Sequence, residues 1–300
     1  LVLAIVIVGV GAGFGALKGI LDDTPNINAD ALIPKGYKTT LVYQNGKEIT
    51  TLANSNSNRE YVYYDSIPED LVNAFVAIED RRFWEHNGID VQGIARAFIK
   101  GLKSGDFDEG ASTLTQQLIK NNVFNVGLDE TTFLDRLERK VQEQYLAVDM
   151  EKKLDKKSIV EYYLNTIYLG QGCYGVETAA QTYFGKALSQ LTVSECAVLA
   201  AIPQNPTKFD PLVYPDDNKS RRTQVLKYML DLEYITQAQY DEAINDNVYK
   251  RIASISKKEE KQQKTEVNSY YTDEVINQLQ SDLVAKGYSE DEAEAMIWSG

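Results

Sequence analysis

The densest group of reactive side chains lies between residues 79 and 90. Glu79 and Asp80 follow apolar residues at helical spacing that end at Ile78, and His86, the only histidine of the chain, comes shortly after them. Because the C-terminal end of a helix disfavours further negative charge, a carboxylate there is suited to accept a proton as a general base. The alternative is an ordinary charged helix end with surface ion pairs.

A second group begins with a glycine-led turn and continues through Ser112, Thr113, Gln116, Gln117 and Lys120. Hydroxyls and backbone N–H groups at the start of a helix are a common way to hold phosphate or sugar oxygens. Two adjacent glutamines followed by a lysine are unusual for a helix that only packs. The alternative is a Ser/Thr cap on a polar surface.

The third group lies on a predicted helix over 132–154. Its apolar stripe consists of Leu134, Leu137, Val141, Tyr145 and Val148. At about 100° per residue, a neighbouring face carries Arg136, Arg139, Lys140 and Glu143. A carboxylate among three cations is stabilised in its charged form, and the same cations could neutralise a diphosphate. The alternative is a helix surface with i,i+4 ion pairs, such as Arg139 with Glu143.

The remaining polar candidates favour structural roles. The stretch 157–186 is rich in glycine and tyrosine, and we interpret Glu161 and Asn165 within it as residues that fix loops. Cys173 and Cys196 are interpreted as inert thiols. Two cysteines and one histidine exclude a disulfide scaffold, a four-cysteine metal site and a histidine-rich zinc site.

The composition is that of a folded, acidic protein of roughly two domains' length. The chain has 300 residues, 31 Lys plus Arg and 44 Asp plus Glu, and so a formal net charge of -13. This acidic balance disfavours nucleic acid as a partner, because phosphate backbones are bound by a surplus of basic residues. With 43% hydrophobic residues the chain is not a disordered tail.

An apolar run opens the chain and predicts a membrane anchor over residues 1–21. Leu1 to Leu17 include no charged or strongly polar side chain, and Lys18 is the only charge before Leu21. About 17 to 25 apolar residues are needed to span a bilayer. The alternatives are a cleaved signal peptide and a buried helix at a domain edge. Because the first residue is not Met, we expect a fragment of a longer protein.

The elements that must position these groups are mostly helical. A β-hairpin over 40–52 is predicted around Asn45-Gly46, and a short strand over 61–63. Ser66 and Glu69 have the spacing of a capping box that opens a helix. Thr192 with Glu195 and Thr236 with Gln239 give two more start signals. Further helices are predicted over 91–103, 112–123, 132–154, 157–169, 175–184, 192–202, 219–232 and 236–246.

In this order and at this spacing the motifs resemble the peptidoglycan glycosyltransferase family 51, found in class A penicillin-binding proteins and monofunctional transglycosylases. The resemblance covers about residues 60 to 213. It rests on Glu-Asp-Arg-Arg-Phe with His and Gly-Ile-Asp, then Gly-Ala-Ser-Thr-Leu-Thr-Gln-Gln, then Arg-Lys with Glu three positions on. It implies a mainly α, lysozyme-like glycosyltransferase domain, which the transmembrane helix and the short β-hairpin segment predicted above precede.

Composition, pattern and resemblance together predict an order of domains. We expect an anchor over 1–21, a linker with the hairpin over 22–60, the glycosyltransferase domain over 61–250, a charged linker over 251–267, and the truncated start of a transpeptidase-linked region over 268–300. The polar run 257–264 is either a solvated linker or an exposed helix face. A Ser-x-x-Lys match at 254–257 has no partner motifs after it, so β-lactam binding is not predicted.

By the same resemblance the chain polymerises lipid II into β-1,4-linked glycan strands with release of polyprenyl diphosphate. Glu79 is then the general base, and the configuration inverts. Glu143 helps to place donor or acceptor, and Lys120, Arg139 and Lys140 neutralise the leaving diphosphate. Arg136 is a further candidate for that role. Ser112, Thr113, Gln116 and Gln117 line the sugar and phosphate site, while Asp80 and His86 support the loop that carries Glu79.

The implied surroundings are those of a cell-wall enzyme. We expect a single-pass protein of the bacterial cytoplasmic membrane with its catalytic domain on the extracytoplasmic side. Its partners would be lipid II, the growing glycan strand, the bilayer through residues 1–21, and cell-wall synthesis proteins. No cofactor is required by the resemblance, although a Mg or Mn ion could lie at the diphosphate. Phe98, Ile99 and Leu102 could dip into the bilayer or belong to the core.

Three rival functions fit parts of the sequence. A lysozyme-type hydrolase would also use a glutamate in a helical cleft, but its neutral leaving group needs no cationic set. A non-catalytic scaffold would bind glycan or partner proteins and keep its activity without Glu79. A metal-dependent transferase lacks an Asp-x-Asp pair in a suitable setting.

Overall fold

The computed structural model describes residue 15 and residues 17–54, 57–104, 112–124, 132–263 and 270–299. The chain divides into two compact units. Unit 1 comprises Leu1–Ile33 and Arg82–Tyr163, and unit 2 comprises Pro34–Arg81 and Leu164–Gly300.

Unit 1 is helical. Its described elements are η1 (Ala29–Leu32), α3 (Val91–Ser104), α4 (Leu114–Val123), α5 (Phe133–Met150) and the first part of α6 (Lys156–Thr166). Helix α4 packs against α5 and η1. The start of α5 is fixed by a capping box, because Thr132 and Asp135 exchange side-chain and backbone hydrogen bonds of 2.8 and 3.2 Å. Its core includes Phe83, Leu114, Leu118, Ile119, Leu146, Met150, Ile159 and Tyr163.

Unit 2 contains a second helical core. Its helices are α2 (Glu69–Glu79), α7 (Val176–Phe184), α8 (Val193–Ala200), α9 (Pro215–Asp231), α10 (Gln237–Asn245) and α11 (Val248–Gln263), with 3-10 turns η2 (Tyr64–Ser66) and η3 (Leu188–Gln190). Helix α8 is buried over nearly its whole length and contacts both α2 and α9. Because most side chains of α8 are small and apolar, this helix forms the centre of the core.

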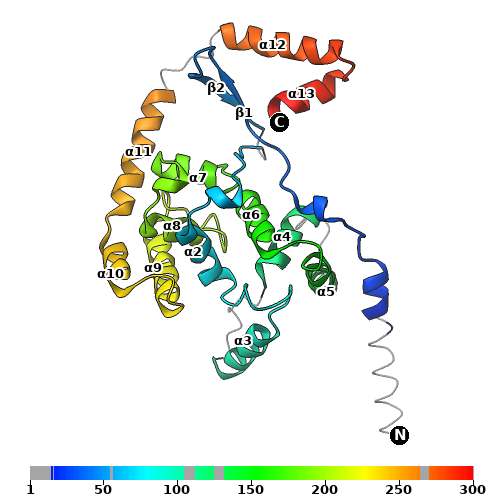
Figure 1. Cartoon of the computed structure of the whole chain (residues 1–300), viewed down its shortest axis with the longest axis vertical. Helices are drawn as coiled ribbons and strands as arrows, with labels where there is room; N and C mark the ends of the chain where they lie inside the picture. Colours follow the sequence, from blue (N-terminus) through cyan, green and yellow to red (C-terminus); the bar gives the residue numbers. More distant parts are fainter. Residues whose placement is uncertain are drawn as a thin grey trace. The chain divides into compact units, whose positions relative to one another are not determined.

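A small sheet with two helices completes unit 2. Strands β1 (Thr39–Val42) and β2 (Glu48–Leu52) pair antiparallel, and Gly46 in the turn has φ +79°. Helices α12 (Tyr270–Ala285) and α13 (Glu290–Ser299) lie beside this hairpin (Figure 1). Leu41, Leu52 and Ile297 form their common buried core. Residues far apart in the chain thus fold together.

The structure confirms the mainly helical fold with a short β-hairpin. The helices differ from their predicted bounds mainly at their ends: α5 stops at Met150 and α9 already begins at Pro215. The capping boxes at Thr192 and Thr236 are both present. The charged run from 257 belongs to α11 as far as Gln263, so the helical interpretation holds there.

Two local predictions are wrong. Residues 61–63 form no strand, because the Asn165 side chain takes both backbone hydrogen bonds of Val62. The predicted capping box of Ser66 and Glu69 is absent as well: Pro68 is the N-cap of α2, and Ser66 lies in η2. A proline with φ near -60° can begin a helix on its own, so the serine is not needed.

No described helix is long and apolar enough to cross a membrane. Residues 1–14 and 16, which make up most of the predicted anchor, lie outside the described residues. Three apolar residues were considered for a second membrane contact. Ile99 is exposed, and the side chains of Phe98 and Leu102 lie outside the part of the chain that the structure describes.

Candidate active site

Glu79 is the last residue of α2 in unit 2. The helix ends because Asp80 leaves helical geometry, with φ -157° and ψ 75°, while its N–H still donates to Val76 O at 3.0 Å. The Glu79 side chain is 11% exposed, and its Oε1 lies 3.7 Å from Nη2 of Arg221 on α9. A carboxylate at the negative end of a helix is therefore compensated by a cation from another helix.

Nothing in the sequence pointed to Arg221, because it lies far from Glu79 along the chain. Its guanidinium lies 5.5 Å from the Phe209 ring centroid, and Arg81 lies over the ring of Tyr228, also on α9. Helix α9 thus supplies contacts to both Glu79 and Arg81. Only the packing of α2 against α9 reveals this pairing.

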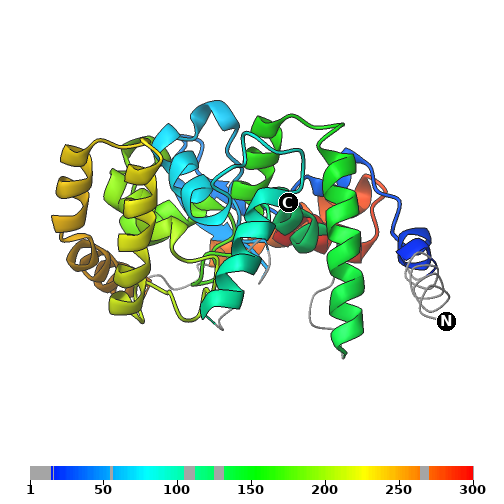
Figure 2. The same ribbon diagram turned by 90° about the horizontal axis from the view of Figure 1, so that it is seen from below.

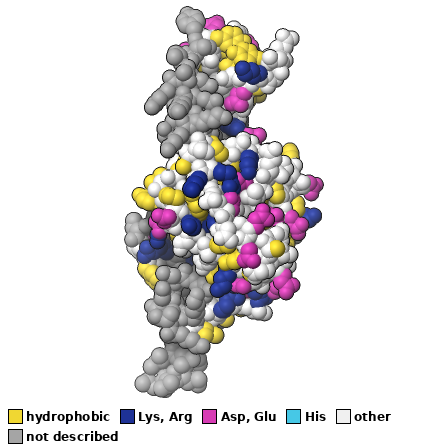
Figure 3. Space-filling view, turned by 90° about the vertical axis from the view of Figure 1, so that its left-hand side faces the viewer, with side chains coloured by type: hydrophobic (Ala, Val, Ile, Leu, Met, Phe, Trp, Pro, Cys, Tyr) yellow, Lys and Arg dark blue, Asp and Glu magenta, His cyan; other side chains and the backbone are white. Residues whose placement is uncertain are grey.

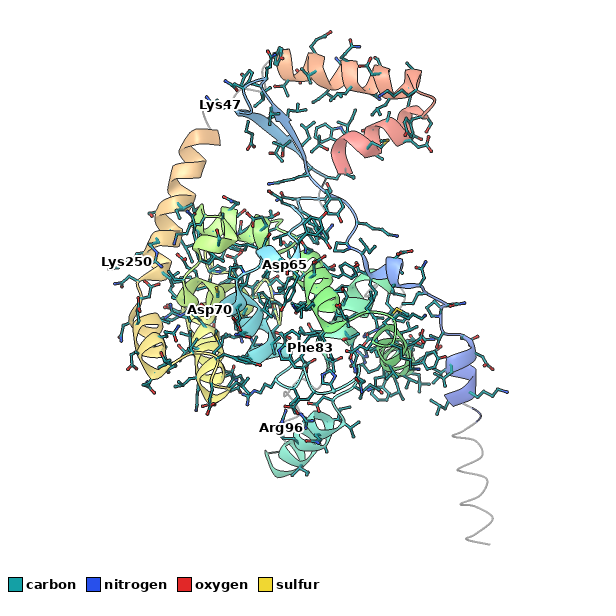
Figure 4. All side chains as sticks on the ribbon, in the orientation of Figure 1. Lys47, Asp65, Asp70, Phe83, Arg96 and Lys250 are labelled. Atoms are coloured by element: carbon teal, nitrogen blue, oxygen red, sulfur yellow. The ribbon has the colours of Figure 1, made fainter. Side chains whose placement is uncertain are left out.

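In unit 1, Arg82 organises the segment that follows. Its side chain pairs with Glu85 at 3.1 Å, lies 3.8 Å from Asp90 and also donates to Gln92. The buried Phe83 (labelled in Figure 4) packs edge-on against His86 at 6.2 Å between ring centroids. The segment is therefore a compact turn in which His86 is almost fully buried.

The carbonyl of Gly88 links this turn to the start of α4. Gly88 O accepts hydrogen bonds from Thr113 Oγ1 at 2.8 Å and from Gln116 Nε2 at 3.2 Å. Thr113 is also the N-cap of α4, since its hydroxyl accepts from the Gln116 N–H. These two predicted site residues are buried and hold one another in place. Gln117, next to them, accepts from the hydroxyl of Tyr163 at 3.1 Å.

Glu143 forms the centre of the second charged cluster. Its side chain is fully buried on α5, and it accepts from Lys140 Nζ at 2.7 Å and from Arg139. Lys140 also donates to Ser112 Oγ at 2.7 Å, so residues from both motifs meet here. The predicted i,i+4 pair of Arg139 with Glu143 is present. A buried carboxylate with two cations is a site where phosphate oxygens could replace one of the contacts.

The other predicted residues lie elsewhere. Arg136 is exposed on α5, and Lys120 is half-buried in the last turn of α4. Asn165 belongs to unit 2, where it is buried and bonded to the backbone of Val62. Both cysteines are buried, and burial raises the pKa of the Cys196 thiol. Among the described residues there is no group of three His, Cys, Asp or Glu side chains that could hold a metal ion.

Comparison with known proteins identifies the family. The family model described as Transglycosylase matches residues 45–230, which is more than half of the chain. The chain is 50% identical over 190 residues to penicillin-binding protein 1A of Aquifex aeolicus, covering 62% of this chain and 25% of that protein. It is 37% identical over 287 residues to penicillin-binding protein 1A of Streptococcus oralis, covering 93% of this chain and 42% of that protein.

The chain therefore spans less than half the length of these relatives. A crystal structure of penicillin-binding protein 1A from Haemophilus influenzae is similar with a TM-score of 0.40 and 26% identity, covering 71% of this chain and 21% of that one. The matched range 45–230 includes Glu79, the Gly88 turn and the Glu143 cluster. The chain belongs to the transglycosylase family, the peptidoglycan glycosyltransferases that its motifs resemble.

Proposed function

We propose that the chain polymerises lipid II into β-1,4-linked glycan strands and releases polyprenyl diphosphate. The observation that carries the proposal is the Transglycosylase match over residues 45–230, because this range contains every residue predicted for the site. The growing glycan is the donor and an incoming lipid II is the acceptor.

Glu79 is the general base of this reaction. It takes the proton from the acceptor 4-hydroxyl, and the oxygen attacks the anomeric carbon of the donor from the side opposite the diphosphate, so the configuration inverts. Its low exposure and its position 3.7 Å from Arg221 support this role, since both restrict the carboxylate to few orientations. Asp80 and His86 keep the flanking backbone in place.

The cations on α5 stabilise the charge that develops on the leaving diphosphate. Lys140 is suited to this because its side chain is 38% exposed while its ammonium already contacts Ser112 and Glu143. Glu143 aligns Lys140 and Arg139 before substrate arrives, which lowers the cost of reorganisation during the reaction. Lys120 and Arg136 supply further positive charge, and the reaction requires no cofactor.

The lipid-linked substrate places the enzyme at a membrane. Residues 1–21 anchor the chain in the bacterial cytoplasmic membrane, with the catalytic part on the extracytoplasmic side. An anchor on the same surface raises the effective concentration of enzyme and substrate. Cell-wall synthesis proteins are the expected protein partners.

The test is polymerisation of labelled lipid II by the detergent-solubilised chain, with products separated as glycan ladders on a gel. We expect ladders from the wild type and a loss of at least about 100-fold in Glu79→Gln, the usual scale for removing a general base. Glu85→Gln is the matched control, because Glu85 lies in the same motif but its side chain is 65% exposed. Ladders from Glu79→Gln at the wild-type rate, or a wild type that only cleaves preformed glycan, would contradict the proposal.

A further inference from the structure

A buried ion pair closes the corner between α5 and α6 in unit 1. Lys156 Nζ lies 2.7 Å from Glu151 Oε2, and the Glu151 side chain is only 3% exposed. The Lys156 side chain is 22% exposed, but its Nζ atom is buried. Figure 2 shows α5 along its length and the short connection from its end to α6. The two charged residues lie on either side of this connection.

The electrostatics of the two helices do not explain this placement. Glu151 is the C-cap of α5, where the helix dipole disfavours a negative charge. Lys156 is the first residue of α6, where the dipole disfavours a positive charge. The start of α6 has a separate cap, since Asp155 Oδ1 accepts from the Ser158 N–H at 2.7 Å. Each charge of the pair is therefore compensated by the other, and the start of α6 does not depend on Lys156.

Both members of the pair also contact a motif of the site. We call the turn over 82–88 the motif turn; it includes Phe83. Lys156 Nζ lies 4.2 Å from the centroid of the buried Phe83 ring, within the range of a cation–π interaction. The hydroxyl of Thr115, buried in the first turn of α4, donates to Glu151 Oε1. The pair thus joins the motif turn to the start of α4.

The same two elements are joined a second time by the Gly88 carbonyl. This oxygen of the motif turn accepts from Thr113 and Gln116, two residues predicted to line the sugar and phosphate site. Thr115 lies between them in the sequence, so its contact with Glu151 fixes the same turn of α4. The orientation of these site residues therefore depends on both links.

The burial of the pair indicates what it contributes. Taking two charges out of water costs about as much as their attraction returns, so a buried pair adds little stability over neutral residues of the same shape. A buried pair does restrict geometry, because a carboxylate and an ammonium with fixed partners permit few arrangements of the groups around them. Catalysis is sensitive to such restriction, since a misplacement of about 1 Å can reduce a rate about 100-fold.

We propose that Glu151 and Lys156 are positioning residues for glycan transfer, which hold the motif turn against the first turn of α4. Neither residue takes part in the chemistry itself. The proposal rests on the proposed function, in which this turn of α4 lines the sugar and phosphate site.

The test replaces the pair by neutral residues of similar shape. In the double variant Glu151→Gln/Lys156→Met no charge is left buried, so we expect a melting temperature close to that of the wild type. In lipid II polymerisation by the full, detergent-solubilised chain, we expect kcat to fall about ten-fold or more and KM to stay within about two-fold, because positioning acts on the transition state. The matched control is Asp149→Asn/Lys153→Met, which removes an exposed ion pair at the same end of α5 and should leave both constants unchanged.

The single variant Lys156→Met separates positioning from stability. It leaves the Glu151 carboxylate buried without a cation, so both the melting temperature and kcat should fall. Adding Glu151→Gln should restore the melting temperature but not kcat. Recovery of both would overturn the proposal, and so would a double variant that is unfolded at the assay temperature, because the pair would then serve only the fold.

A spectroscopic measurement tests the position of the motif turn without any activity. His86 is the only histidine of the chain and packs edge-on against Phe83, so isotope-labelled histidine gives a single imidazole NMR signal that reports on this turn. We expect the signal to move or broaden in the neutral double variant and to stay unchanged in the control. An unchanged signal in both would overturn the proposal. A wild type that does not polymerise lipid II would contradict the proposed function, while the histidine signal would still decide whether the pair holds the turn.

Discussion

Asn165 shows how one buried side chain can take the place of a β-strand. Its Oδ1 accepts from Val62 N–H and its Nδ2 donates to Val62 O, both at 2.8 Å. Its own carbonyl accepts from Arg59 Nε at 2.6 Å. An asparagine amide offers both a donor and an acceptor, so it can satisfy an extended backbone as a neighbouring strand would.

We expect Asn165→Asp to lower the free energy of unfolding by about 2 to 4 kcal/mol, because the carboxylate cannot donate to Val62 O and brings a buried charge. Urea unfolding of the whole chain measures this difference. Asn277→Asp is the control, since Asn277 is exposed on α12 of the same unit. An Asn165→Asp variant as stable as the control would show that water or a shifted backbone replaces the amide.

At the scale of elements, Gly88 sets how closely the motif turn approaches α5. It has φ +88°, and a Cβ at this position would lie 2.6 Å from the carbonyl carbon of Ala147. The turn therefore needs glycine both for its backbone angle and for the contact with the helix. Because Gly88 O also accepts from Thr113 and Gln116, this contact couples α5 to the start of α4.

Replacing this glycine should be costly. We expect Gly88→Ala to lower the free energy of unfolding by about 2 to 4 kcal/mol, from left-handed strain and the clash with the α5 backbone. Gly172→Ala separates the two causes: Gly172 has φ +70°, but a Cβ there would meet nothing within 4 Å, so we expect about 1 kcal/mol. Thermal unfolding followed by circular dichroism measures both. Equal losses would mean that the close approach to Ala147 has no cost of its own.

The junction of α10 and α11 predicts a dependence on pH. Arg251 Nη2 donates to Asp246 Oδ2 at 2.7 Å, and this hydrogen bond lowers the pKa of the Asp246 carboxyl. A carboxyl with a lowered pKa in the folded state stabilises the fold above its ordinary value of 3.8, and this stabilisation is lost as the pH falls through the lower, folded-state pKa.

We expect Asp246→Asn to lower the free energy of unfolding at neutral pH by about 0.5 to 1 kcal/mol, because Arg251 is partly exposed and solvent weakens the pair. The difference from wild type should shrink as the pH is lowered past the ordinary value. Urea unfolding at a series of pH values measures it, with Asp241→Asn on α10 as the control. A constant difference at all pH values would contradict the assignment to this carboxyl.

At the scale of the whole molecule, the hairpin and the last two helices form one folding unit within unit 2. Ile297 of α13 is buried with Leu41 and Leu52, and Tyr37 N–H donates to Ser299 O at 2.6 Å. The hydroxyl of Ser57 donates to Trp298 O at 2.7 Å. A hairpin with two strands is barely stable alone, so α13 supplies the surface that it needs.

Loss of the core that the hairpin shares with α13 should lower the local stability of the hairpin. We expect Ile297→Ala to speed amide hydrogen exchange in β1 and β2 by about ten-fold or more, because a cavity next to the hairpin lowers its local stability. Exchange in α2, α8 and α9 should not change. Met296→Ala, at an exposed neighbour on α13, is the control. Unchanged exchange in the hairpin would show that it folds without α13.

The distribution of the charged side chains, whose formal net charge is -13, is also a property of the whole molecule. On the face shown in Figure 3, Lys and Arg side chains lie near Asp and Glu side chains in several places. Lys186 and Arg251 both pair with the buried Glu195, which caps α8 as well. Acids that terminate or cap helices thus receive their counter-ions from other elements of the same unit.

Turns, helix caps and ion pairs could be predicted from the sequence where the residues that form them are close along the chain. Asn45-Gly46 predicted the hairpin turn, and Thr192 with Glu195 predicted the start of α8. The charged face of α5 was predictable because residues three and four apart are neighbours on any helix. The capping box predicted from Ser66 and Glu69 is absent for a local reason as well, since Pro68 is the N-cap residue of this helix.

The sequence by itself determined the family, the helical elements and the ion pairs within α5, because these depend on spacing along the chain. Only the tertiary structure decided that Arg221 pairs with Glu79, that Lys140 reaches Ser112, and that Asn165 replaces a strand. It also decided that the apolar stripe of α5 faces outward, since periodicity defines two faces of a helix but not which one the core covers. Those contacts join residues far apart in the chain, and packing alone brings them together.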